Sequence, residues 1–159
     1  MDLSKLFRRP RHNLKVTPDE EPLRSAQEDL RATTIPLDRP LSSQEREIAE
    51  WLLNNTSPTS PSFIPQLDHV RVVGRCSCGC PTVNLRVAEG TTPAMPQDNP
   101  IGDAIGEVNG NMVGVMLLQR SGYLTCLEVY DLSDLKHPYP LPDLASLRPF
   151  EAAHPGKDD

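Results

Sequence analysis

The chain has few aromatic residues and no long apolar run, and both shortages limit what it can be. Aromatic residues make up 4% and hydrophobic residues 37% of its 159 positions, so we expect part of the chain to lie outside a packed core. The longest nearly unbroken apolar run, at 113–118, is too short for a bilayer, which needs about 20 residues. No apolar segment follows the basic start of the chain, so we expect no secretory leader. The sequence therefore predicts a cytoplasmic protein without a membrane span.

Basic residues are also scarce after the first part of the chain. The whole sequence holds 16 Lys and Arg against 22 Asp and Glu, a net charge of −6, and five of the basic residues lie within 1–15. An acidic body is poorly suited to phosphate backbones, so we expect no nucleic-acid partner. A basic protein partner is compatible with this charge. Whether residues 1–15 bind anything is left open.

Proline, by contrast, is abundant, with 17 residues, and it helps to mark the limits of the expected domain. Residues 1–40 show no sustained periodicity, which predicts a disordered tail and linker. Periodic segments within 41–150 predict one domain, and residues 151–159 are expected to be disordered. Prolines after residue 131 predict an extended segment that packs on the edge of the domain.

The patterns within 41–150 predict an α+β fold. Residues 41–55 are typical of a helix, because Ser42 and Glu45 can form a capping box and Trp51 belongs to an apolar stripe expected in the core. A short helical turn is expected after Ser60. Asn-Gly between apolar segments predicts a type I′ hairpin turn. Alternating segments predict an antiparallel meander of about five strands, with one or two N-terminal helices on one face; the strands are expected at 70–76, 82–88, 104–108, 112–118 and 123–130.

The stretch 75–87, R-C-S-C-G-C-P-T-V-N-L-R-V, is the one local constellation in this sequence that points to chemistry. Cys76, Cys78 and Cys80 fall within five residues, between two expected strands. Residues i and i+2 of an extended segment point the same way, so all three sulfurs can share a face. A turn at Gly79 brings them closer together.

Three interpretations of these cysteines stay open. The simplest is that reduced cysteines fill a tight turn as small apolar side chains. The second is a zinc site in which Cys126, from the last strand, supplies the fourth ligand. The third is redox or nucleophilic chemistry, with a disulfide between Cys76 and Cys80, although no base is placed by the sequence.

The histidines are not expected to help. His69 is separated from Cys76 by about 23 Å of extended strand, at about 3.3 Å per residue. His12 falls in the expected tail, and nothing in the sequence fixes His137 or His154.

The order of the motifs resembles a family of small bacterial proteins of uncharacterised activity, whose hallmark is C-x-C-G-C-P followed by a strand. The likeness covers 41–150 and rests on W-L-L, Q-L-x-x-V-R-V-V, R-C-x-C-G-C-P-T-V, G-x-x-V-G-V-M-L-L, G-Y-L-x-x-L-E-V-Y-D and S-L-R-P. The resemblance implies a bacterial source and, by analogy of size class, an immunity-like or regulatory role.

The sequence therefore predicts a non-enzymatic bacterial binding or regulatory protein, with the exposed sheet face or the cysteine turn as its contact surface. It offers no acid–base pair, nucleophile triad or cofactor loop, so no catalytic or cofactor-binding residue is assigned. The alternative is a small zinc-binding protein with a structural metal at the hairpin turn, its ligands being Cys76, Cys78, Cys80 and Cys126. The oligomeric state stays open.

Overall fold

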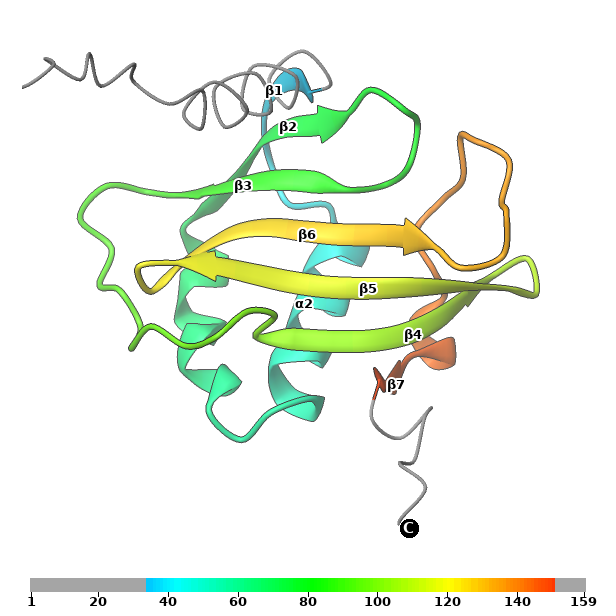
Figure 1. The fold of residues 1–159 in the computed structure, drawn as a ribbon. Helices are drawn as coiled ribbons and strands as arrows, with labels where there is room; N and C mark the ends of the chain where they lie inside the picture. Colours follow the sequence, from blue (N-terminus) through cyan, green and yellow to red (C-terminus); the bar gives the residue numbers. More distant parts are fainter. Residues whose placement is uncertain (1–33, 151–159) are drawn as a thin grey trace, which may run out of the picture. The chain divides into compact units, whose positions relative to one another are not determined.

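The computed structural model describes residues 34–150, which form a sheet with helices packed on one face (Figure 1). All strand pairs are antiparallel, in the order β1-β2-β3-β6-β5-β4-β7. The strands are β1 (Thr34–Pro40), β2 (Val70–Cys76), β3 (Val83–Val87), β4 (Gly102–Val108), β5 (Asn111–Arg120), β6 (Tyr123–Asp131) and β7 (Arg148–Pro149). The helices are α2 (Ser43–Asn55) and the 3-10 helices η3 (Ser60–Asp68) and η4 (Leu144–Ser146). Residues 1–33 of the tail expected at 1–40, and the end expected to be disordered at 151–159, lie outside the described residues.

The α+β class is confirmed, with α2 and η3 behind one face of the sheet (Figure 1). The sheet differs from the expected five-strand meander in the number and the order of its strands. β6, not β4, pairs with β3, through Val83 opposite Leu127 and Asn84 opposite Cys126. The connection at 88–101 carries the chain past β6 and β5, so β4 lies on the far side of β5. Among the helices of residues 34–150, none has the length and apolar composition that a bilayer crossing requires.

The sheet begins at Thr34, before the domain boundary expected at residue 41. β1 pairs with β2 alone and is therefore an edge strand. Its two prolines, Pro36 and Pro40, suit an edge, because a strand that is paired on one side only can lack some backbone donors. The prolines that suggested a linker are thus compatible with a strand at this position.

The capping box predicted for the first helix is present in α2. Ser42 Oγ accepts a hydrogen bond from Glu45 N at 3.1 Å, and Ser42 N donates to Glu45 Oε2 at 2.8 Å. Leu52 and Leu53 are fully buried, whereas Trp51, expected as the core anchor, is half-buried against the core. The predicted position of the helix is thus confirmed, but its buried face is formed by the residues next to Trp51 and not by Trp51 itself.

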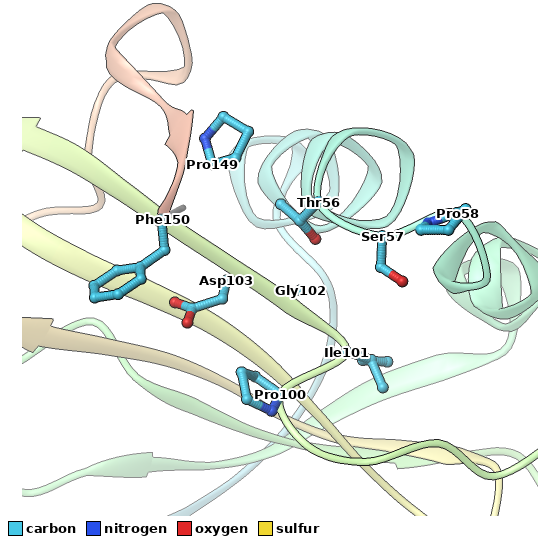
Figure 2. Close-up of a pocket in the computed structure, with 9 residues that line it drawn as sticks. All are labelled: Thr56, Ser57, Pro58, Pro100, Ile101, Gly102, Asp103, Pro149 and Phe150. Atoms are coloured by element: carbon cyan, nitrogen blue, oxygen red, sulfur yellow. The ribbon is translucent and has the colours of Figure 1, made fainter. Parts of the chain in front are cut away.

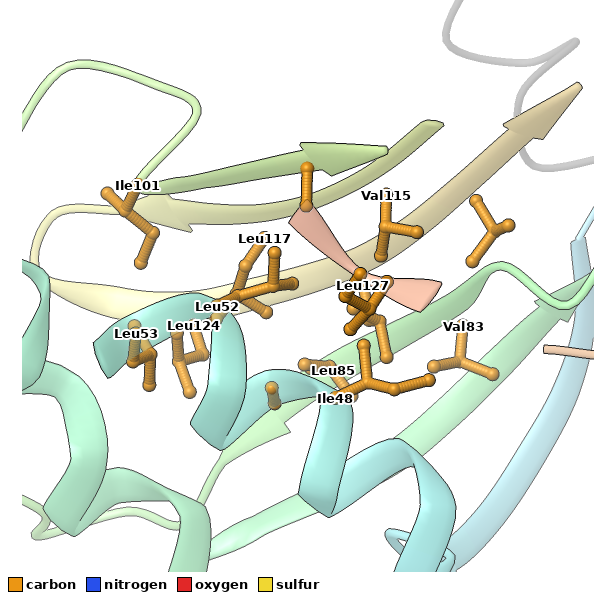
Figure 3. Packing of buried hydrophobic residues seen from close by; sticks show 14 of the residues in the cluster. Ile48, Leu52, Leu53, Val83, Leu85, Ile101, Val115, Leu117, Leu124 and Leu127 are labelled. Carbon is orange, nitrogen blue, oxygen red and sulfur yellow. The ribbon is translucent and has the colours of Figure 1, made fainter. Parts of the chain in front are cut away.

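The core lies between α2, η3 and the face of the sheet that they cover (Figure 3). Alternation along β5 places Val113, Val115 and Leu117 on this face, each with no exposed surface. Burying a side chain of this size stabilises the fold by about 1.5–3 kcal/mol. The hairpin predicted at Asn-Gly is confirmed: Asn109 and Gly110 have φ of 50° and 79°, and Val108 pairs with Asn111.

Glu45 joins the start of α2 to the edge strand β1. Its carboxylate, 6% exposed, accepts hydrogen bonds from the two terminal nitrogens of Arg39 at 2.9 and 2.8 Å. Burial is the largest single influence and raises the pKa of Glu45. The hydrogen bonds from Arg39 and Ser42 together outweigh it, so the pKa of Glu45 is lowered.

We expect Glu45→Gln to lower the free energy of unfolding by about 1.5 kcal/mol at pH 7, because glutamine keeps the capping box but loses the charged hydrogen bonds. The folded-state pKa lies below the unfolded value of about 4.3. The stabilisation is therefore present above that value and is lost as the pH falls through the folded-state pKa. Urea unfolding of both proteins at pH 7 and pH 3 measures this, and the difference between them should shrink at pH 3.

Glu50→Gln serves as the matched control, since Glu50 forms an exposed ion pair with Arg46 on the same helix. We expect it to change the free energy of unfolding by less than about 0.5 kcal/mol. An equal loss for Glu45→Gln at both pH values would contradict the ionic contribution.

Candidate metal centre

The three turn cysteines come together at the tip of the β2–β3 hairpin. Their Sγ atoms all lie within 4.8 Å of one another, and the sulfurs of Cys76 and Cys78 are 3.0 Å apart. The amide of Cys80 donates a hydrogen bond to Cys78 Sγ at 3.4 Å. Two tetrahedral thiolate ligands at about 2.3 Å from zinc lie about 3.8 Å apart. The three sulfurs are therefore close enough to share one metal ion, provided that those of Cys76 and Cys78 move about 0.8 Å further apart.

The backbone of the turn explains why the sulfurs converge. Cys76 N donates to Thr82 O at 3.3 Å, which closes the hairpin. Gly79 has φ of +91°, and a Cβ at this position would lie 3.1 Å from Pro138 Cα. Both the positive φ and the close approach favour glycine. The reversal expected at Gly79 is present, and it is packed against a distant part of the chain.

That distant part is the segment at 137–139, which lies alongside the turn (Figure 1). His137 Nδ1 is 3.0 Å from Cys78 O, although the two residues are 59 positions apart. Tyr139 N donates to Gly79 O at 3.3 Å. The expectation that nothing fixes His137 was therefore wrong. No local pattern of the sequence indicates this contact, because it depends on how the irregular segment after β6 packs.

The rings of Tyr139 and His137 pack edge to face, with 5.0 Å between their centroids. Tyr139 is 7% exposed, and its hydroxyl is buried without a hydrogen-bond partner among the described residues. Burial raises the pKa of Tyr139 to about 12, and negative charge on Cys80, Asp131, Cys78 and Cys76 adds to the shift. The hydroxyl is thus a neutral donor with no partner among the described residues.

Cys126, the fourth expected ligand, is not one of the sulfurs in the group. It lies in β6, opposite Asn84 on one side and Leu118 on the other. Burial, together with the charges of Glu128 and Cys80, raises the pKa of Cys126 to about 12. A cysteine binds a metal as the thiolate. Cys126 would therefore have to lose its proton, which this environment disfavours, before it could act as a ligand. The assignment of Cys126 as a ligand stays a prediction.

Of the described histidines, His69 is not part of the turn. His69 follows η3 at the start of β2, the end of the strand opposite to Cys76. This placement agrees with the separation expected from the sequence. His12 and His154 lie outside the described residues.

A separate hollow of about 450 Å³ opens between the end of α2, the start of β4 and β7 (Figure 2). Asp103 lines it, and Asp103 Oδ1 is buried without a hydrogen-bond partner among the described residues. Burial raises the pKa of Asp103, although a hydrogen bond from the Ala104 amide opposes the shift. Asp103 is the only ionisable residue in the lining, which consists of Thr56, Ser57, Pro58, Pro100, Ile101, Gly102, Asp103, Pro149 and Phe150. The lining therefore contains no pair of ionisable groups for general acid–base chemistry. No motif of the sequence indicated this hollow.

Comparisons with protein-family models, curated proteins and solved structures found no match for this chain. No relative's activity therefore bears on the cysteine turn. The resemblance to a bacterial family with a C-x-C-G-C-P motif stays a prediction.

Proposed function

We propose that this protein is a small non-enzymatic metal-binding protein that holds Zn²⁺ through the thiolates of Cys76, Cys78 and Cys80. The observation that carries the proposal is the group of three sulfurs within 4.8 Å of one another at one hairpin turn. Thiolate ligands favour soft or borderline metals, among which zinc is the usual structural ion. The Cys80 amide supports a thiolate at Cys78 by its hydrogen bond.

The role proposed for the metal is structural. The turn is packed against 137–139 through Gly79 and Pro138, so an ion at the turn stabilises both segments in their folded arrangement. A metal that binds only the folded state adds about 2.7 kcal/mol at a free concentration one hundred times its dissociation constant. The turn offers no buried general base beside the sulfurs that would indicate a catalytic zinc.

We expect the protein, purified without a histidine tag, to carry one zinc per chain and to lose it in Cys78→Ser. The thiol of Cys78 is the most exposed of the three, and its Sγ accepts hydrogen bonds from Cys76 Sγ and Cys80 N. The variant keeps two of the three thiols, which are too few to hold the ion. Elemental mass spectrometry measures the zinc, and the melting temperature with and without chelator measures its effect on stability.

Cys126→Ser is the matched control, because it removes a thiol outside the group and should retain the zinc. A wild-type protein that is free of metal after zinc addition, with a melting temperature that chelator does not change, would contradict the proposal. Loss of two free thiols in such a protein would favour redox chemistry, for which the sequence suggested Cys76 with Cys80, whereas the sulfurs 3.0 Å apart are those of Cys76 and Cys78.

A regulatory or immunity-like role through a protein partner, in the cytoplasm of a bacterium, remains the broader proposal from the sequence. The acidic charge of the chain is compatible with a basic partner. The structural metal site is compatible with such a role, because it stabilises a surface turn that a partner can contact.

A further inference from the structure

Three thiolates leave one position of a tetrahedral zinc site to be filled. Cys126 and His137 both lie near the turn, and neither belongs to the group of sulfurs within 4.8 Å. They differ in how freely they can move. Cys126 is held in the middle of the sheet by strand pairing on both sides. His137 is exposed and lies outside the strands and helices, so no strand pairing fixes its backbone.

His137 also contacts the backbone of the cysteine turn. Its Nδ1 lies 3.0 Å from the carbonyl oxygen of Cys78, the central cysteine of the group. Two residues on, Tyr139 N donates to Gly79 O. These two contacts hold 137–139 against 78–79 and keep the imidazole beside the sulfurs.

The hydrogen bond determines which ring nitrogen is available. A carbonyl oxygen only accepts, so His137 Nδ1 must carry the proton in this contact. In the neutral imidazole the lone pair is then on Nε2. Donation of one ring N–H to a backbone carbonyl while the other nitrogen binds the ion is the usual arrangement of histidines that bind metals.

A second feature supports a ligand site at this place. The Tyr139 hydroxyl is buried and has no hydrogen-bond partner among the described residues, and Tyr139 belongs to the buried cluster against which Cys80 packs. A buried donor without a partner is unfavourable. A metal-bound thiolate of Cys80 would be an acceptor for this proton, and the ring of Tyr139 contacts the His137 ring edge to face.

We propose that His137 supplies the fourth ligand through Nε2, so that the site is Cys₃His and the ion links the β2–β3 turn to the segment after β6. This inference rests on the proposed metal binding at Cys76, Cys78 and Cys80. It replaces Cys126 as the fourth ligand and assigns a role to the C-terminal segment.

Cobalt(II) titration of the reduced full-length chain tests the inference. Thiolate-to-cobalt charge-transfer absorption reports the number of sulfur ligands, and the visible bands report a tetrahedral site and its ligand set. For the wild type we expect tetrahedral bands with three thiolates, and the same spectrum for Cys126→Ser. His137→Ala should shift the visible bands and weaken cobalt binding about tenfold or more. His137→Cys should raise the charge-transfer intensity by about a third.

His69→Ala is the matched control, because it removes an exposed imidazole at the other end of β2. It should leave the spectrum and the affinity unchanged. Far-UV circular dichroism of each metal-free variant checks that it is folded. Lower charge-transfer intensity in Cys126→Ser, with His137→Ala unchanged, would overturn the inference in favour of Cys126.

If both variants match the wild type, water fills the fourth position and the inference is likewise wrong, while metal binding by the three cysteines stands. Absence of charge-transfer absorption in the wild type contradicts the proposed function itself. The two failures are therefore distinguishable.

Discussion

Gly122→Ala is expected to lower the free energy of unfolding by about 3 kcal/mol, of which about 1–2 kcal/mol is backbone strain and the rest overpacking. Gly122 is the second central residue of the turn between β5 and β6 and has φ of +84°. A Cβ at Gly122 would meet the carbonyl oxygen of Ala94 and lie 3.0 Å from Pro93 Cβ. The turn would therefore have to move away from the loop at 88–101. This movement would also break the hydrogen bond from Ala94 N to Gly122 O.

Gly90→Ala separates the two causes, because Gly90 has the same φ of +84° and nothing within 4 Å of an added Cβ. We expect it to lower the free energy of unfolding by about 1 kcal/mol, from the backbone conformation alone. Urea unfolding followed by tryptophan fluorescence and circular dichroism measures both variants. Equal losses for Gly122→Ala and Gly90→Ala would show that the contact with Ala94 contributes nothing.

Gln66→Leu is expected to lower the free energy of unfolding by about 2 kcal/mol, because it removes the side-chain acceptor of the buried Leu124 amide and one of the two donors to Gly122 O, which keeps the bond from Ala94 N. Gln66 is 2% exposed. Its Nε2 donates to Gly122 O at 2.6 Å, and its Oε1 accepts from Leu124 N at 3.0 Å. Leucine has a similar size and fills the space, so the loss reports the hydrogen bonds that join η3 to the β5–β6 turn.

The matched control is Gln44→Leu, at an exposed position of α2 whose side chain makes one long hydrogen bond, 3.4 Å to Pro142 O. We expect a change below about 0.5 kcal/mol. Thermal and urea unfolding of the two variants measure the difference. A Gln66→Leu protein as stable as the wild type would mean that the Leu124 amide finds another partner and that the bond from Ala94 N is sufficient for Gly122 O.

Gly122 and Gln66 also show why the strand order could not be predicted from the sequence. The sequence places a turn near residue 122, but the loop before β4 and the helix η3 both bond to that turn. Their contacts join residues 56 positions apart in the case of Gln66 and Gly122. Local patterns contain no information on such partners, and consecutive strands are neighbours often enough to make a meander the natural expectation.

At the cysteine turn, the sequence predicted the part that depends on neighbours in the chain. A spacing of two residues and a glycine were enough to bring Cys76, Cys78 and Cys80 together. The fourth position depends on the packing of distant segments, and there the expectation chose Cys126 and set His137 aside. The contact of His137 with Cys78 follows from the packing of an irregular segment, which has no periodic pattern from which to predict it.

The sequence by itself determined the elements whose causes are local: the capping box of α2, the Asn109–Gly110 hairpin and the group of three cysteines. Each depends on hydrogen bonds, dihedral preferences or spacing within a few residues. Tertiary structure alone decided the strand order, the edge position of β1 and the contact of 137–139 with the turn. These depend on which apolar faces and backbone groups meet across long separations in the chain, and that selection is made by the packing of the whole sheet.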